Sequence, residues 1–183
     1  EILVIAQDST SYGWDLTPKT SLHELVIELD KIEGLDWIRL HYAHPSHLHR
    51  KMIEQFGNLE RLIPYLDMPI QHTDTEVLKH MRRGVTQNKL TDLIAEIRTE
   101  VPGIRLRTTL IVGYPTETKG QFDGMLSFLE ETKFDRLGVF PYSQEDDTLA
   151  FDLGDKISTK EKQRRVKAVM ELQENISLFK NMD

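Results

Sequence analysis

Apolar residues recur along the chain in two kinds of block, which alternate throughout its length. Some blocks are continuous and of strand length, such as EILVIAQ, whereas others space apolar side chains three or four positions apart, as a helix requires. Strands are predicted at residues 1–7, 36–43, 65–70, 104–113 and 136–142. Helices are predicted at residues 21–32, 47–56, 73–81, 86–101, 117–133 and 158–179.

Five strands separated by four helical connections favour parallel strand–helix–strand units. Such units build either a barrel or a doubly wound sheet, and the pattern alone leaves both open. In both arrangements ligands bind at the carboxyl ends of the strands. The five strand ends read AQDST, YAHPS, PIQHT, VGYPTET and PYSQE, so each leads into hydroxyl, amide, carboxyl or imidazole groups. This convergence predicts a polar ligand site at that edge.

Two local signals concern helix ends. Ser21 is predicted as the N-cap of the first helix, with Glu24 completing a capping box. The stretch MRRG allows two interpretations: Arg82 and Arg83 bind a carboxylate or phosphate, or Gly84 ends a helix whose dipole the arginines favour. The sequence leaves both open.

Other strand ends carry weaker signals. GYPTET at 113–118 could present backbone N–H groups to an anion or an adenine edge, but it is neither G-x-G-x-x-G nor a P-loop. Gln71 and His72 end the third strand. Gln7 and Asp8 end the first strand, where they are either site groups or part of an ordinary Asx turn.

The composition limits location and partners. The 183 residues, 39% hydrophobic and 29% charged, suit a globular protein with one sizeable core. The net charge of −7 argues against nucleic-acid binding by this chain and suits a basic protein partner. No apolar run approaches the roughly 20 residues of a membrane helix and no signal peptide is found, so a cytoplasmic protein is expected. The chain lacks cysteine and begins within a strand without Met, which predicts a piece of a longer protein.

Four of the seven histidines fall in HYAHPSHLHR, which raises the question of a zinc site. Strand and helix periodicity argues against it, because His47 and His49 are two positions apart at a helix start and therefore face apart. His41 and His44 lie at the strand end, one or the other near the cavity. We predict no metal ligands in this chain and keep a zinc hydrolase as an alternative.

Read in order, the strand ends resemble one family. AQDSTSYG, HYAHPS, YLDMPIQHTDTEVLKHMRRG, RTTLIVGYPTETKGQF and GVFPYSQEDDTLA are similar to the core domain of the radical S-adenosylmethionine methylthiotransferases. The QDST and PYSQEDDT versions resemble the branch that modifies an aspartate of a small-subunit ribosomal protein more than the branch that modifies tRNA.

The resemblance implies a partial (β/α)6 TIM-like barrel without its first strand and cluster loop. Residues 1–183 would be a fragment of the core domain, with strands over about 1–142, a linker at 146–158 and a last helix at 158–179. The CxxxCxxC motif for one [4Fe–4S] cluster, a domain with a second cluster and a C-terminal substrate-binding domain would lie outside the chain. The fragment alone is therefore expected to be inactive, and a non-catalytic barrel fragment is a further alternative.

The resemblance also implies the cofactors and the reaction. The intact enzyme would use S-adenosylmethionine and two [4Fe–4S] clusters to place a methylthio group on the β-carbon of the aspartate. A tRNA methylthiotransferase is the alternative within the enzyme class. No catalytic residue is assigned, and the positions that match cofactor-binding positions of the family are Gln7, Asp8, Gln71, His72, Arg83, Ile111, Gly113, Phe140, Pro141 and Tyr142.

Each of these positions has an expected part in the family's site. Gln7 and Asp8 would approach the methionyl amino end, Gln71 and His72 the ribose, and Arg83 the methionyl carboxylate. The backbone at Ile111 and Gly113 would frame the adenine, which Phe140, Pro141 and Tyr142 would close from the other side.

The superfamily motif G-x-I-x-G-x-x-E is present only in part. Thr109 stands at its first glycine, and the acid, Glu117, falls one position late. Glu117 is therefore expected to cap the following helix instead of contacting the cofactor.

Overall fold

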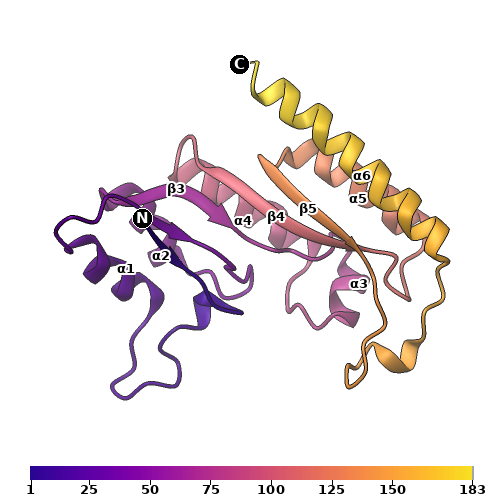
Figure 1. The fold of residues 1–183 in the computed structure, drawn as a ribbon, viewed down its shortest axis with the longest axis horizontal. Helices are drawn as coiled ribbons and strands as arrows, with labels where there is room; N and C mark the ends of the chain where they lie inside the picture. The colour runs from indigo at the N-terminus through magenta and orange to yellow at the C-terminus, as the bar shows by residue number, and fades with distance from the viewer. Residues whose placement is uncertain (183) are drawn as a thin grey trace. The chain divides into compact units, whose positions relative to one another are not determined.

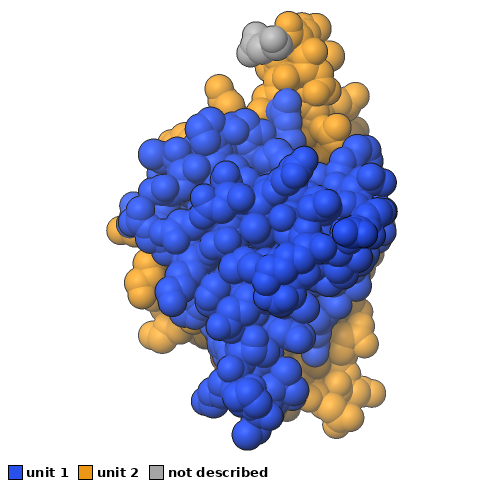
Figure 2. Space-filling model, turned by 90° about the vertical axis from the view of Figure 1, so that its left-hand side faces the viewer, with its two compact units in different colours: residues 1–69, 92–107 blue, residues 70–91, 108–183 orange. Residues whose placement is uncertain are grey.

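The computed structural model describes residues 1–182, which form two compact units, coloured separately in Figure 2. Unit 1 contains Glu1–Pro69 and Asp92–Arg107, and unit 2 contains Ile70–Thr91 and the chain from Thr108 onward. Within residues 1–182, no helix is long and apolar enough to cross a membrane.

Strands and helices alternate as the pattern predicts (Figure 1). Four of the strands are shorter than predicted, and the third, predicted at residues 65–70, begins and ends three residues earlier. The strands are β1 (Ile2–Val4), β2 (Ile38–Leu40), β3 (Leu62–Asp67), β4 (Arg105–Val112) and β5 (Arg136–Pro141). The helices are α1 (Leu22–Asp30), α2 (Arg50–Asn58), α3 (Thr75–His80), α4 (Gln87–Glu100), α5 (Lys119–Thr132) and α6 (Thr159–Lys180). Two short 3-10 helices, η1 (Ser9–Ser11) and η2 (Phe151–Leu153), lie where no element is predicted.

The strands form one sheet in the order β1-β2-β3-β4-β5. The pairs β1/β2, β2/β3 and β3/β4 are parallel, with Val4 opposite Leu40 and Asp67 opposite Arg107. A doubly wound sheet reverses its strand order at a switch point, whereas a barrel adds each new strand beside the last. The sequential order therefore selects the barrel type from the two arrangements that the pattern leaves open.

Unit 1 is built around apolar side chains of its strands and of α1 and α2. Ile38, Leu40 and Leu66 are fully buried, and Val26 and Ile53 cover them from the helices. Burying an aliphatic side chain of this size contributes about 1.5–3 kcal/mol, so these contacts hold the short strands in place.

The predicted capping box at the start of α1 is wrong. Ser21 is the N-cap, but its hydroxyl makes no capping bond and donates instead to the Glu24 side chain at 2.8 Å. That side chain also accepts from Thr20 at 2.9 Å. Two hydroxyls therefore compete for the carboxylate that the box requires.

In unit 2, α6 packs against β5 and against α5, and it runs beside β5 in Figure 1. Along β4, the side chains of Thr108, Leu110 and Val112 are buried, whereas Thr109 and Ile111 on the other face stay partly exposed. Phe122, Met125, Phe128, Phe134 and Val169 supply the core beneath the buried face. One face of β4 therefore packs against helices, and the other is available to a ligand.

Candidate functional site

A cavity of about 600 Å³ lies within unit 2 at the carboxyl ends of its strands. Its walls include the predicted residues Gln71, Arg83, Ile111, Phe140, Pro141 and Tyr142. Met81, Thr109 and Tyr114 also line it, and the loop that follows β5 contributes Ser143, Glu145, Thr148 and Ala150. Six of the ten predicted positions thus meet at one cavity.

The β4 wall is joined directly to Gln71. The Gln71 N–H donates to the Thr109 carbonyl at 2.9 Å, and its carbonyl accepts from the Ile111 N–H at 2.8 Å. Gln71 has a φ of 69°, a left-handed conformation that costs a residue with a Cβ roughly 1 kcal/mol. Such conformations persist where the surrounding structure enforces them, often at ligand sites. The backbone bonds to β4 enforce it here.

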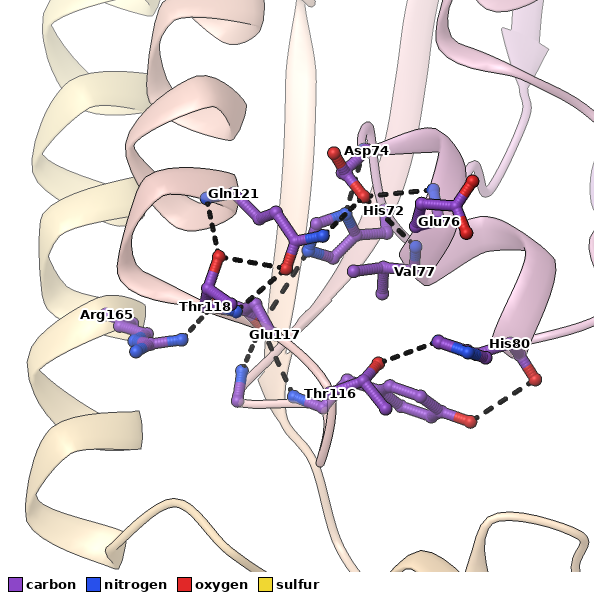
Figure 3. Close-up of polar contacts among 12 residues, drawn as sticks. His72, Asp74, Glu76, Val77, His80, Thr116, Glu117, Thr118, Gln121 and Arg165 are labelled. Atoms are coloured by element: carbon purple, nitrogen blue, oxygen red, sulfur yellow. Dashed lines mark hydrogen bonds and ion pairs between the residues drawn. The ribbon is translucent and has the colours of Figure 1, made fainter.

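The GYPTE turn after β4 is closed by Glu117. Its Oε2 accepts from the N–H groups of Gly113 at 2.5 Å and Tyr114 at 3.2 Å, and its own N–H donates to the Tyr114 carbonyl. The predicted role of Glu117 as a helix cap is therefore wrong. Thr118 and Gln121 form the capping box of α5 instead, as the dashed lines of Figure 3 show.

His72 lies beneath the cavity and does not line it. Its side chain is fully buried, and Nδ1 accepts from the Asp74 N–H at 3.0 Å. That bond places the ring proton on Nε2, which lies 3.8 Å from Glu117 Oε2. In this structure the His72 side chain faces Glu117, which closes the turn that carries Tyr114, and its expected part at the ribose stays a prediction.

Two tyrosines face each other in the cavity wall. The rings of Tyr114 and Tyr142 meet edge to face at 5.4 Å, and the Tyr142 hydroxyl donates to the Ala150 carbonyl at 3.2 Å. Burial raises the pKa of both phenols, helped at Tyr142 by the charges of Asp155 and Glu145. Both rings therefore remain neutral near pH 7 and offer hydroxyl groups within an apolar wall.

Arg83 reaches the cavity from the end of α3. The helix stops because Arg82, next to the C-cap Met81, takes a left-handed φ of 54°, and the Arg83 N–H then donates to the Leu78 carbonyl at 2.9 Å. The proposed end of the helix at Gly84 is thus two residues too late. Arg82 therefore ends the helix and Arg83 lines the cavity, and binding of a carboxylate or phosphate by Arg83 stays a prediction.

Gln7 and Asp8 belong to unit 1 and are not among the residues that line this cavity. Asp8 accepts from the Thr10 N–H at 3.0 Å, from the hydroxyls of Thr10 and Ser11, and from His47 Nδ1 at 2.8 Å. Burial raises the pKa of Asp8, but these hydrogen bonds outweigh it and lower the pKa to about 2. The Asx-turn interpretation of Asp8 is therefore correct for this structure.

Histidines of the stretch 41–50 contact one another and a neighbouring carboxylate. The rings of His44 and His47 stack at 4.5 Å, a contact that the strand and helix periodicity does not predict. His41 Nδ1 lies 3.4 Å from the fully buried Asp67. In residues 1–182, no three His, Asp or Glu side chains are placed to hold a metal ion.

Two residues of α6 that are not among the predicted positions contact the loops of the cavity wall. Arg165 Nη1 lies 2.6 Å from Glu117 Oε1, and Lys162 Nζ donates to the Tyr142 carbonyl at 2.8 Å. Figure 3 shows Arg165 approaching Glu117 from α6. A signal for them exists: Lys162 and Arg165 share the helical stripe of Val169 and Ile176, which is the buried face of α6.

Comparisons with known proteins fit this site. Residues 7–129 match the Radical SAM superfamily. The chain is 49% identical over 99% of its length to "Ribosomal protein uS12 methylthiotransferase RimO" of Chloroherpeton thalassium, covering 42% of that protein. It is 45% identical over 97% of its length to the protein of the same name from Cytophaga hutchinsonii, of which it covers 40%. The chain thus spans about two fifths of these relatives.

A solved structure supports the fold. Coproporphyrinogen III oxidase from Escherichia coli, described as a radical SAM enzyme, matches with a TM-score of 0.66 and 21% identity, over 85% of this chain and 36% of that one. The prediction of a partial radical SAM barrel is confirmed by the sheet and by this match. The chain belongs to the radical SAM superfamily.

Proposed function

We propose that residues 1–183 are the S-adenosylmethionine-binding core of a methylthiotransferase that modifies the β-carbon of an aspartate in ribosomal protein uS12. The observation that carries this proposal is the similarity of nearly the whole chain to relatives named for that activity. The acidic balance of the chain, −7, suits a basic substrate protein and gives no support to the tRNA alternative.

The cavity of unit 2 fits the nucleoside half of S-adenosylmethionine. Its volume of about 600 Å³ falls within the usual range for small-molecule sites. Ile111, Phe140 and Pro141 offer an apolar slot for the adenine. The cavity is also lined by Gln71, which we assign to the ribose, and by Arg83, which we assign to the carboxylate of the methionyl half.

The remaining predicted positions have indirect or unassigned parts in this proposal. Gly113 shapes the backbone next to the adenine slot, and His72 supports the turn from below. Gln7 and Asp8 stay predictions for the methionyl amino end. Asp8 has its oxygens committed to Thr10, Ser11 and His47, so Gln7 is the stronger of the two.

An iron–sulfur cluster does not fit the residues of this chain. Cluster ligands are cysteine thiolates, and the sequence has no cysteine. We therefore assign no residue to either [4Fe–4S] cluster. Thiolates for them would have to come from chain outside these 183 residues.

Bound S-adenosylmethionine would supply the radical that removes hydrogen from an unactivated carbon. The residues of this chain would hold and orient it. Arg83 would fix the carboxylate, the neutral Tyr114 and Tyr142 would shield the nucleoside from water, and the strained backbone of Gln71 would set the position of its amide.

The test uses the full-length protein with its clusters reconstituted, and uS12 or tRNA as the substrate. Mass spectrometry should find a methylthio group on an aspartate of uS12, and Arg83→Met should weaken S-adenosylmethionine binding about tenfold. Lys79→Met, on the exposed side of α3, is the matched control. A methylthio group on tRNA alone, or no cleavage of S-adenosylmethionine with either substrate, would refute the proposal.

A further inference from the structure

Two buried cationic side chains of α6, Lys162 and Arg165, contact the loops that form the cavity walls. Lys162 is 3% exposed and Arg165 is 5% exposed, although lysine and arginine are almost never fully buried unless paired. Neither residue lines the cavity. Their role follows from the groups that they bind.

Lys162 holds the loop that follows β5. Its Nζ donates to the Tyr142 carbonyl at 2.8 Å and pairs with Asp155 at 2.5 Å, across the loop from Tyr142. The Tyr142 N–H donates to the Val112 carbonyl at 2.8 Å. Tyr142 is therefore fixed through its N–H by β4 and through its carbonyl by α6, and the loop to Asp155 is closed over it.

Arg165 holds the other loop, the GYPTE turn. Its Nη1 lies 2.6 Å from Glu117 Oε1, while the second Glu117 oxygen binds the N–H groups of Gly113 and Tyr114. Glu161 contacts the Nε of Arg165 at 2.9 Å and so orients the guanidinium from within the helix. Tyr114, in the cavity wall, is thus connected to α6 through one carboxylate.

The close approach of α6 also explains why residue 113 is a glycine. Gly113 has a φ of 75°, and a Cβ built there would lie 2.5 Å from Cγ of Lys162 and 3.1 Å from its Cδ. The stem of Lys162 therefore occupies the space of the missing side chain. The same lysine packs on the first loop and hydrogen-bonds to the second.

We propose that Lys162 and Arg165 are positioning residues, through which α6 sets the spacing of Tyr142 and Tyr114 and thereby the width of the cofactor cavity. This inference rests on the proposed function for the identity of the ligand, but its structural part does not. Apolar residues would fill the same stripe at lower desolvation cost, as Val169 and Ile176 do further along it. What the cations add is a fixed geometry for two loops, by way of a carbonyl and two carboxylates.

The experiment compares Lys162→Met with Lys167→Met in the full-length, cluster-reconstituted protein. Methionine keeps the stem that packs on Gly113 and removes only the ammonium. Lys167 is on the same helix, and its side chain is 77% exposed. We expect the dissociation constant for S-adenosylmethionine to rise about tenfold for Lys162→Met with an unchanged number of sites, and to stay the same for Lys167→Met.

The number of binding sites per molecule distinguishes a loss of loop positioning from partial unfolding of the variant. A variant that merely unfolds a fraction of the molecules loses binding sites while the remaining ones keep their affinity, and that result would overturn the proposal. So would an unchanged dissociation constant for Lys162→Met. The double variant Glu117→Gln, Arg165→Met, which removes both charges of the second contact, should likewise weaken affinity without loss of sites.

Amide hydrogen exchange tests the structural part without a ligand. Lys162→Met should speed exchange over residues 142–155 and leave 113–117 slow, whereas Lys167→Met should change neither. Equal exchange in the two variants would overturn the positioning of the loop by Lys162. A parent protein that does not bind S-adenosylmethionine would refute the proposed function, and the exchange comparison would still decide the role of Lys162.

Discussion

The ion pair between Glu117 and Arg165 allows the most quantitative prediction. The Glu117 side chain is fully buried, and that of Arg165 is 6% exposed. Arg165→Met leaves a buried carboxylate that keeps its two backbone N–H donors but loses its cation. Breaking one partner out of a buried pair typically costs about 3–5 kcal/mol, so we expect a loss of about 3 kcal/mol in the free energy of unfolding.

The double variant Glu117→Gln, Arg165→Met should cost no more than Arg165→Met alone. Glutamine keeps an oxygen for the N–H groups of Gly113 and Tyr114, and methionine fills the space over the Phe122 ring, which the guanidinium now covers at 5.2 Å. The two single changes are therefore expected to be strongly non-additive, with a coupling of about 2–3 kcal/mol.

Urea unfolding of the parent, the two single variants and the double variant measures this coupling. Arg164→Met is the matched control, because Arg164 is adjacent, its side chain is 54% exposed, and its ion pair with Glu161 lies at the surface, where such pairs add little. A coupling below about 0.5 kcal/mol would show that the pair is not formed as described. So would an equal effect of the Arg164 and Arg165 variants.

Three further predictions follow from other parts of the chain. Gly113→Ala should cost about 2–3 kcal/mol by thermal unfolding, since its φ is left-handed and its Cβ would meet the Lys162 stem; a change under 1 kcal/mol would contradict this. The folded pKa of Asp8, about 2, lies below its ordinary 3.8, so Asp8 stabilises the fold above pH 4 and this is lost as the pH falls toward 2. The melting temperature of the parent should therefore fall more steeply than that of Asp8→Asn between pH 4 and 2, and parallel curves would refute the assignment. Phe140→Ala should leave the melting temperature nearly unchanged, because Phe140 is 59% exposed, yet weaken S-adenosylmethionine binding several-fold in calorimetry; unchanged affinity would remove Phe140 from the site.

The fold was predictable because its signals are local. The alternation of strand and helix blocks depends on the spacing of apolar residues within a window, and β4 and α5 lie within two residues of their predicted bounds. The choice between barrel and doubly wound sheet was not predictable in this way. It depends on which strands pair, and hydrogen bonds between distant strands leave no mark in the spacing.

The errors at helix ends have a common physical cause. Side chains at these positions had more than one possible partner, and tertiary structure decided between them. Ser21 binds Glu24 rather than the helix backbone, and Glu117 binds Gly113 and Tyr114 rather than α5. Sequence spacing predicts that a carboxylate can accept a hydrogen bond from the first turn of a helix. It does not predict that other donors, brought close by the tertiary structure, bind the same carboxylate instead.

The same reasoning explains why six predicted site residues meet and others do not. Strand alternation and strand-end position suffice to bring Gln71, Ile111 and Tyr142 to one edge. His72 follows Gln71 directly, and because neighbouring residues at a strand end point to opposite sides, its side chain enters the core when that of Gln71 enters the cavity. The cavity wall therefore contains the side chain of Gln71 and not that of His72.

The charged start of α6 departs from the apolar pattern that a buried helical face normally follows. A buried helical stripe that begins with Lys162 and Arg165 conflicts with the apolar stripe that packing requires, and such conflicts concentrate where a fold serves a ligand. Each cation binds a loop that follows a strand, and the strand pattern predicts only where such a loop begins. The strands therefore determine where the cavity lies, and α6 determines the distance between its walls. Arg165 in this helix thus acts on the site through Glu117, which lies nearly fifty residues earlier in the chain.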